Sequence, residues 1–184
     1  VVQGSFSPYG DNWSVYFDGS GDYIKTTTNI DDIATSEDFN IEAWIYVTDT
    51  SVIRGIFQSG EGNDTLGIRI TTAERLQLVQ TNGSTLEESA ASAITLNKWH
   101  HIAVSRSSGT RRLFLDGSIV DSTTSSTASF PCDKAVVGGR WLSGSLGQPF
   151  SGYISNVRFV VGSAVYTSAF TPPTEPLTAV TNTE

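Results

Sequence analysis

Carboxylates at alternate strand positions are the first side chains in this sequence that could do chemistry. Asp38, Asn40 and Glu42 fall on one face of a predicted strand. Two carboxylates that straddle a glycosidic bond can hydrolyse it, one protonating the leaving oxygen and the other attacking the sugar or activating water. Because the middle residue is an amide, we interpret Glu42 as the structural partner of a cation, Arg54 or Arg158, and keep glycoside hydrolysis as an alternative.

Metal and nucleophile chemistry has few other candidates. The two histidines, His100 and His101, are adjacent and point to opposite faces of a strand, so they cannot bind one metal together. The sequence contains neither a nucleophile elbow nor a phosphate-binding loop. Asp18 and Asp22 lie in one tight turn, where they can cap backbone amides or contribute oxygens to a calcium site.

These side chains must be positioned by β-strands. From Trp99 to Ser105, and again from Phe39 to Val47, side chains alternate between two faces with the period of a strand. The dipeptide Asp116-Gly117 tolerates the positive φ of a tight hairpin turn. Turn residues recur about every eight to twelve positions, which is typical of an all-β sandwich.

The predicted strands follow one another along most of the chain, at residues 13–17, 23–27, 39–47, 54–59, 65–71, 75–81, 99–105, 111–115, 118–121, 135–139 and 152–161. We expect a short helical turn within Asn29 to Asp38 and a polar edge strand with a loop at Asp121 to Ser129. Arg140 to Pro149 is expected to be a long, flexible Gly/Ser loop that carries Trp141.

Composition bounds the class of protein. The chain has 184 residues, 38% of them hydrophobic, which is enough for one packed domain. A net charge of -8 argues against nucleic acid or an anionic membrane surface as a partner, and no apolar run has the length needed for membrane insertion. The single Cys132 cannot form an internal disulfide, so packing must hold the fold.

Six short segments resemble, in order, the laminin-G/pentraxin branch of the concanavalin A-like lectin and glucanase superfamily. They are VYFDGSGDY at 15–23, FNIEAWI at 39–45, WHHIAV at 99–104, LFLDG at 113–117, AVVGG at 135–139 and FSGYISNVR at 150–158. The closing AVYTSAFTPP at 164–173 is similar, more narrowly, to laminin-G-like modules of structural proteins of bacteriophages, especially marine ones. The resemblance implies an antiparallel two-sheet jelly roll.

The same resemblance implies a calcium ion at the rim of the sandwich. Asp64 matches the position of the acidic ligand and Thr81 that of the backbone carbonyl ligand. The resemblance places the remaining ligands in the loop at residues 140–151. This loop has no acidic side chain, so Gln148 or loop carbonyls would have to supply the oxygens. Calcium takes about six to eight oxygen ligands, and this set is poor in anionic ones.

The rim is also where the resemblance places the binding of glycans or proteins. An aromatic ring stacks on the apolar face of a sugar, and neighbouring polar groups bind its hydroxyls. Trp141 is the expected platform, with Arg140, Asn63, Asp64 and Asn82 beside it, and Gln148 is a further candidate in the loop.

We therefore expect a lead-in at residues 1–12, a laminin-G-like sandwich at 13–177 and a polar tail at 178–184. The expected function is non-catalytic adhesion to a cell-surface glycan or glycoprotein, as part of a larger virion or extracellular protein. The alternative is a structural virion spacer that packs against neighbouring subunits, in which Phe6 and Tyr9 of the lead-in are interface residues.

Overall fold

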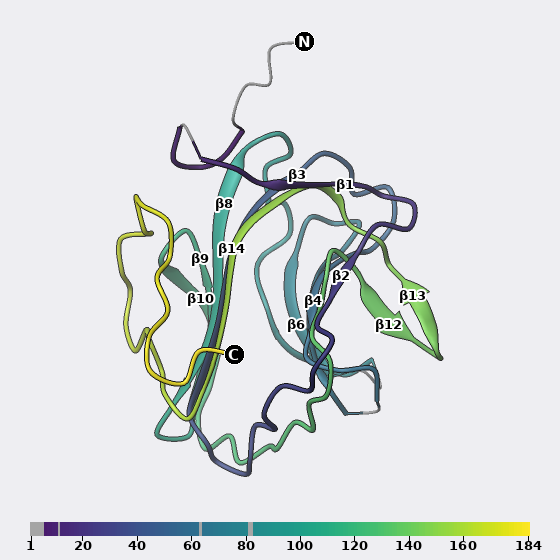
Figure 1. Cartoon of the computed structure of the whole chain (residues 1–184). Coiled ribbons are helices and arrows are strands. Elements are labelled where there is room, and N and C mark those ends of the chain that lie inside the picture. The colour runs from purple at the N-terminus through teal and green to yellow at the C-terminus, as the bar shows by residue number, and fades with distance from the viewer. Residues whose placement is uncertain (1–5, 11, 63, 81–82) are drawn as a thin grey trace.

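The computed structural model describes residues 6–10, 12–62, 64–80 and 83–184. These residues form two six-stranded antiparallel sheets that face each other, and a separate hairpin (Figure 1). The described part contains no helix, and therefore none that could span a membrane. The predicted all-β, two-sheet jelly-roll class is confirmed.

The first sheet has the strand order β1-β14-β3-β8-β9-β10. Its strands are β1 (Val15–Asp18), β14 (Ser151–Val161), β3 (Phe39–Val47), β8 (Trp99–Ser107), β9 (Thr110–Leu115) and β10 (Ser118–Thr123). Strand β8 was predicted from its alternation, and β9 from its place before the Asp116-Gly117 turn. The polar strand β10 lies at the sheet edge, as expected for the Ser/Thr-rich stretch that it opens.

The second sheet has the order β2-β11-β4-β5-β6-β7. Its strands are β2 (Ile24–Lys25), β11 (Val136–Val137), β4 (Arg54–Gln58), β5 (Leu66–Ile70), β6 (Leu76–Gln80) and β7 (Thr85–Glu88). The hairpin of β12 (Arg140–Leu142) and β13 (Ser145–Gly147) lies outside this sheet in Figure 1.

The hydrophobic core lies between the inner faces of the two sheets. On β3 the side chains of Phe39, Ile41, Ile45 and Val47 are at most 1% exposed, so the alternation read from the sequence assigns the correct inner face. Leu66, Ile68 and Ile70 of β5 face them from the second sheet and belong to the same core cluster. Burial of this apolar surface is the main stabilising contribution.

Three local expectations were wrong. Residues 29–38 form no helical turn: Ile33 bridges to Phe130, and a tight turn at residues 35–36 follows, with Ser36 at a φ of 61°. Strand β7 was missed because its sequence is polar, the buried Glu87 being paired with Arg111 at 2.7 Å. The expected loop at 140–149 is the β12–β13 hairpin, whose turn places Ser143 and Gly144 in the left-handed conformation, with φ of 50° and 82°.

Both ends of the chain pack on the outer face of the first sheet. Phe6 lies 4.9 Å from the ring of Tyr46 and 4.6 Å from that of Tyr153, and Tyr9 lies 5.9 Å from Trp44. Phe6 and Tyr9 of the lead-in thus pack on this domain. At the other end, the segment after β14 runs back beside the first sheet (Figure 1), and Thr183 bridges to Val160.

Candidate functional site

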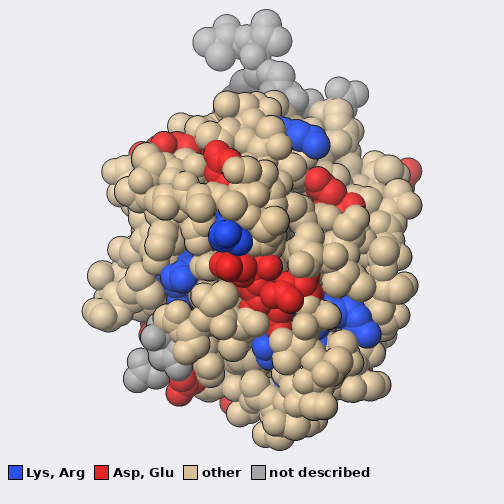
Figure 2. Space-filling model, turned by 180° about the vertical axis from the view of Figure 1, so that it is seen from behind, with Lys and Arg blue, Asp and Glu red and all other residues tan. Residues whose placement is uncertain are grey.

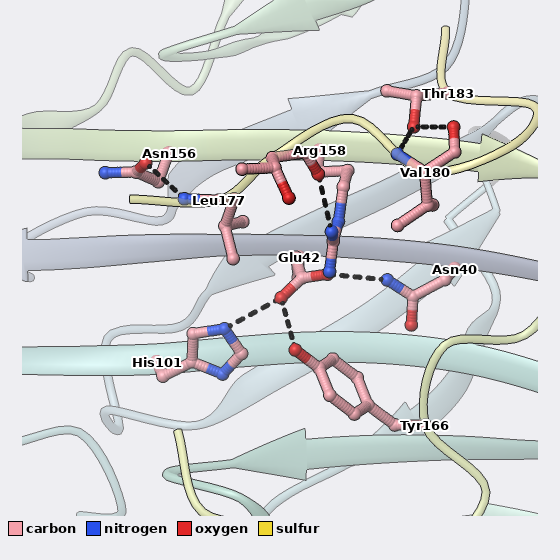
Figure 3. A network of polar contacts seen from close by, with 10 residues as sticks. Asn40, Glu42, His101, Asn156, Arg158, Tyr166, Leu177, Val180 and Thr183 are labelled. Atoms are coloured by element: carbon pink, nitrogen blue, oxygen red, sulfur yellow. Dashed lines mark hydrogen bonds and ion pairs between the residues drawn. The ribbon is translucent and has the colours of Figure 1, made fainter. Parts of the chain in front are cut away.

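The carboxylate of Glu42 is fully buried within a polar network, as Figure 3 shows. Its Oε1 accepts hydrogen bonds from Arg158 Nε at 2.9 Å and Nη2 at 2.6 Å, and from Asn40 Nδ2 at 3.0 Å. Its Oε2 accepts from Tyr166 at 2.8 Å and is 3.1 Å from His101 Nε2. Arg158 is therefore the cation that pairs with Glu42.

Arg54, the other cation considered for Glu42, pairs with Asp49 instead. Burial by itself would raise the pKa of Glu42. Hydrogen bonds from His101 and Arg158, the charge of Arg158 and the Tyr166 hydroxyl outweigh it and hold this pKa below its usual value. An ionised, fully engaged and buried carboxylate cannot reach a glycosidic bond, so Glu42 has a structural role.

Trp141 is held at the rim of the second sheet by the side chain of Gln58. The Trp141 amide donates to Gln58 Oε1 at 3.0 Å, and Gln58 Nε2 donates to the Trp141 carbonyl at 3.0 Å. Gln58 is itself fully buried in β4. The backbone of Trp141 is thus fixed on a rigid strand and does not belong to a flexible loop, which is a correction to the prediction.

The partly buried ring of Trp141 is contacted by Tyr23, which precedes β2, and by Lys25 of β2. Tyr23, 43% exposed, meets it edge to face with ring centroids 5.8 Å apart. The Lys25 ammonium lies 4.6 Å from the ring centroid and pairs with Glu61 at 2.6 Å. We call these four residues, Tyr23, Lys25, Glu61 and Trp141, the aromatic rim.

Arg140 does not line this rim. Its side chain is 1% exposed and lies over Gly55 and Gly67 of β4 and β5, because neighbouring residues of β12 point to opposite sides. Its Nη1 donates to Gln148 Oε1 at 3.2 Å, which joins the two predicted loop residues to each other. Arg140 is thus buried beneath the hairpin and not beside the Trp141 ring at the surface, and its part in ligand binding stays a prediction.

Three predicted rim residues, Asn63, Thr81 and Asn82, lie outside the described residues. Asp64 is exposed with a φ of 64°, and its carbonyl lies 3.5 Å from Gln80 Nε2. Asp18 and Asp22 cap their own turn, Asp18 Oδ1 accepting from the Ser20 amide at 2.7 Å and Asp22 Oδ2 from the Asp18 amide at 3.1 Å.

Calcium binding at the rim stays a prediction, because Thr81, one of the two ligands that the resemblance assigns there, lies outside the described residues. Within the described residues, no three His, Cys, Asp or Glu side chains gather closely enough to hold a metal ion. Asp64 is the one carboxylate there that the resemblance assigned to calcium. Calcium needs several carboxylate or carbonyl oxygens, and backbone carbonyls or residues outside the described part would have to supply the others.

An apolar cleft opens on the other side of β2. Its volume is about 360 Å³, and it is lined by Trp13, Ser14, Val15, Phe17, Ile24, Val137, Ile154, Ser155, Asn156 and Val157. Trp13, 68% exposed, is the most exposed tryptophan. Because residues of β2 alternate, Ile24 lines the cleft while Tyr23 and Lys25 contact Trp141.

Sequence reasoning missed Trp13, Tyr23, Lys25 and Glu61. Trp13 and Tyr23 had been assigned to predicted strands, and both lie just outside β1 and β2. The sequence does contain a signal for both: each aromatic residue follows a polar residue, Asn12 or Asp22, at the end of a strand. Nothing in the sequence indicated that Lys25 and Glu61 meet across 36 positions.

Charge on the face seen in Figure 2 is mixed. Acidic side chains gather at the middle of this face, with separate basic side chains around them and further acidic ones towards the edges. This arrangement agrees with the net charge of -8 and gives no continuous basic surface on that face for a polyanion.

Comparison with known proteins places the fold. The mouse laminin α1 chain, domains LG4-5, superposes with a TM-score of 0.61 at 21% identity, covering 85% of this chain and 44% of that one. The heptameric SAP-like pentraxin of Limulus polyphemus gives 0.60 at 14% identity, covering 83% and 77%. The CBM40 module of the Ruminococcus gnavus IT-sialidase, bound to α2,3-sialyllactose, gives 0.59 at 17% identity, covering 77% and 85%.

No curated protein matches the sequence. The laminin-G family model described as "Concanavalin A-like lectin/glucanases superfamily" matches residues 18–171. With most of its length matched, the two-sheet jelly roll described above belongs to the laminin-G-type family of the concanavalin A-like lectin/glucanases superfamily.

Proposed function

We propose that this domain is a non-catalytic carbohydrate-binding module that uses the aromatic rim. The observation that carries the proposal is the partly buried Trp141 ring, whose backbone is fixed by Gln58 and which is flanked by Tyr23, Lys25 and Glu61. A rigid aromatic face can stack on the apolar face of a sugar, and the ammonium and carboxylate can bind its hydroxyls. Rigid positioning limits the entropy lost on binding.

Similar solved structures support this proposal. They include the sialidase CBM40 bound to sialyllactose and a putative carbohydrate-binding protein of Bacteroides ovatus, the latter at a TM-score of 0.56 and 17% identity. The burial of Glu42 supports the non-catalytic part of the proposal, since this was the carboxylate considered for hydrolysis.

A glycan array tests the proposal with the purified domain displayed multivalently. We expect wild type to bind a defined sugar class, and Trp141→Ala and Tyr23→Ala to reduce binding at least about tenfold through loss of stacking. Trp13→Ala is the matched control, because it removes an exposed tryptophan from the cleft and leaves the rim intact. Thermal denaturation checks that each variant is folded.

Two results would contradict the proposal: no glycan bound by folded wild type, or undiminished binding by folded Trp141→Ala. A parallel array in EDTA tests the calcium prediction. Binding lost in EDTA and restored by calcium would mean that residues outside the described part complete a metal site.

The carrier that we propose is a larger virion or extracellular surface protein, on the strength of the sequence resemblance of residues 164–173. The alternative, a structural spacer, is favoured by one observation, the exposed apolar side chains Trp13, Val15, Ile24 and Val157 along the cleft. In that case Trp13→Ala would weaken assembly with neighbouring subunits, and the rim variants would change nothing.

A further inference from the structure

Two nitrogen atoms of the Arg140 guanidinium have no acceptor among the described residues. The side chain is 1% exposed, and its Nε and Nη2 are buried without a partner, whereas Nη1 donates to Gln148 Oε1 at 3.2 Å. Buried polar groups in folded proteins are nearly always hydrogen-bonded, and an unused buried donor costs stability. Two adjacent unused donors therefore call for an explanation.

The fold makes room for this guanidinium with two glycines. A Cβ at Gly67 would lie 2.7 Å from Arg140 Nε, and a Cβ at Gly55 would lie 2.7 Å from its Cγ. Glycines on neighbouring strands β4 and β5 thus form a flat cradle on the outer face of the second sheet. Nε and Nη2 belong to the same edge of the guanidinium, where two parallel N–H groups match the two oxygens of a carboxylate.

The charge of Arg140 is also unbalanced. Its described partner, Gln148, is neutral, and the charge that acts on it is that of another cation, Arg69. Burial, with repulsion from Arg69, lowers the pKa of Arg140 to about 10, so the guanidinium is still charged at neutral pH. Arg69 is half-buried, donates to the neutral Gln77 Oε1 at 2.8 Å and has Glu88 as its acidic neighbour. A buried charge without a counter-charge is strongly unfavourable.

We propose that Arg140 and Arg69 form a carboxylate-binding subsite, so that the glycan bound by this module carries an acidic sugar. This inference rests on the proposed carbohydrate-binding function and gives its ligand class. The carboxylate would accept hydrogen bonds from Nε and Nη2 of Arg140. Arg69, which is half-buried, would lie on the solvent side of this subsite.

Because the donor edge of Arg140 is closed to solvent, entry requires the turn end of the β12–β13 hairpin to move aside while Gln58 holds the Trp141 backbone in place. This hairpin forms its own two-stranded sheet and is not a strand of either large sheet. Trp141 follows Arg140 on β12 and faces the other side of the hairpin. A ligand that contacts both residues is therefore longer than one sugar ring.

Matched acidic and neutral oligosaccharides test the inference by calorimetry. The probes are trigalacturonate with its methyl ester, and 3′-sialyllactose with lactose. We expect at least one acidic member to bind about tenfold or more tightly than its neutral match. The variants Arg140→Met and Arg69→Gln should remove that preference, while Arg112→Gln on β9 of the other sheet should keep it.

The outcomes separate the two proposals. Equal affinity for acidic and neutral members would overturn the carboxylate subsite and leave glycan binding standing. A preference for the acid that persists in folded Arg140→Met would also overturn it. If Arg140→Met does not fold, Arg69→Gln decides, and a preference unchanged in that variant counts against the subsite. Failure of folded wild type to bind any probe or array glycan would overturn both proposals.

Discussion

At the scale of single residues, Glu42 explains how a charge remains in the interior of this protein. Moving a carboxylate and a guanidinium out of water costs several kcal/mol, and only good geometry with further hydrogen bonds compensates for it. Here both carboxylate oxygens have several partners, from Asn40, Arg158, Tyr166 and His101. The network joins β3, β8, β14 and the C-terminal segment.

Replacing Glu42 with glutamine should therefore destabilise the fold by about 3 to 5 kcal/mol, because it leaves the buried Arg158 without a counter-charge. Urea denaturation measures the change. Glu88→Gln is the control, since Glu88 pairs with Arg75 at 3.4 Å with both side chains more than a third exposed. Loss of such a surface pair should cost less than about 1 kcal/mol. Equal effects of the two substitutions would show that the Glu42 network adds little.

The pH dependence of stability follows from the same group. The pKa of Glu42 is lower in the folded protein than in the unfolded chain, so its contribution is complete above the unfolded pKa of roughly 4.3. It is lost as pH falls through the folded pKa. The stability of Glu42→Gln should thus fall less steeply between neutral and acidic pH than that of wild type. Parallel pH profiles for the two proteins would contradict this assignment.

At the scale of elements, the C-terminal segment is fastened to the first sheet by close backbone contact and by aromatic stacking. The Phe170 amide donates to the Gly117 carbonyl at 2.9 Å. The Tyr166 and Phe170 rings stack with centroids 3.6 Å apart, and the Tyr166 hydroxyl reaches Glu42. The segment therefore closes the polar network from outside.

Gly117→Ala should detach this segment. A Cβ at Gly117 would lie 1.9 Å from the Phe170 carbonyl oxygen, at a φ of 79°. We expect a loss of about 3 kcal/mol or more, because steric overlap adds to the strain of the left-handed conformation. Gly144→Ala is the control. Gly144 has a similar φ of 82°, but a Cβ there would have no atom within 4 Å. This variant should therefore show the cost of the backbone strain without steric overlap, about 1 to 2 kcal/mol.

Hydrogen exchange would locate the effect of Gly117→Ala. The Phe170 and Leu177 amides, which donate to Gly117 and Asn156, should lose protection in that variant and keep it in Gly144→Ala. Retained protection of both amides in Gly117→Ala would mean that the segment accommodates the methyl group.

At the scale of the whole molecule, the sequence predicts the two sheets well because burial on one face imposes the period of two on β3 and β8. It predicts poorly where another force replaces that pattern. Strand β7 is polar because Glu87 pairs with Arg111, and Arg140 is buried because Gly55 and Gly67 make room for it. The position of Trp141 at a rim was indicated by its place between turn residues. Its neighbours Tyr23 and Lys25 could not be predicted, because they are more than 100 positions away and meet Trp141 only through packing of the folded chain.

The lead-in supplies the last prediction, since it closes the outer face of the first sheet with aromatic rings. Tyr16, Tyr153, Tyr46 and Trp99 pair in register across β1, β14, β3 and β8, and Phe6 packs on three of them. Aromatic pairs contribute about 0.5 to 1.5 kcal/mol each. Phe6 is 39% exposed, so we expect Phe6→Ala to cost about 1 to 2 kcal/mol.

Val52→Ala is the control for Phe6→Ala, because Val52 is 51% exposed and should change stability by less than about 0.5 kcal/mol. If Phe6→Ala leaves the unfolding free energy of the isolated domain unchanged but weakens its association with a neighbouring subunit, Phe6 is an interface residue. The structural spacer would then be the better account of the chain. A stability loss confined to Phe6→Ala instead makes Phe6 part of the fold of this domain.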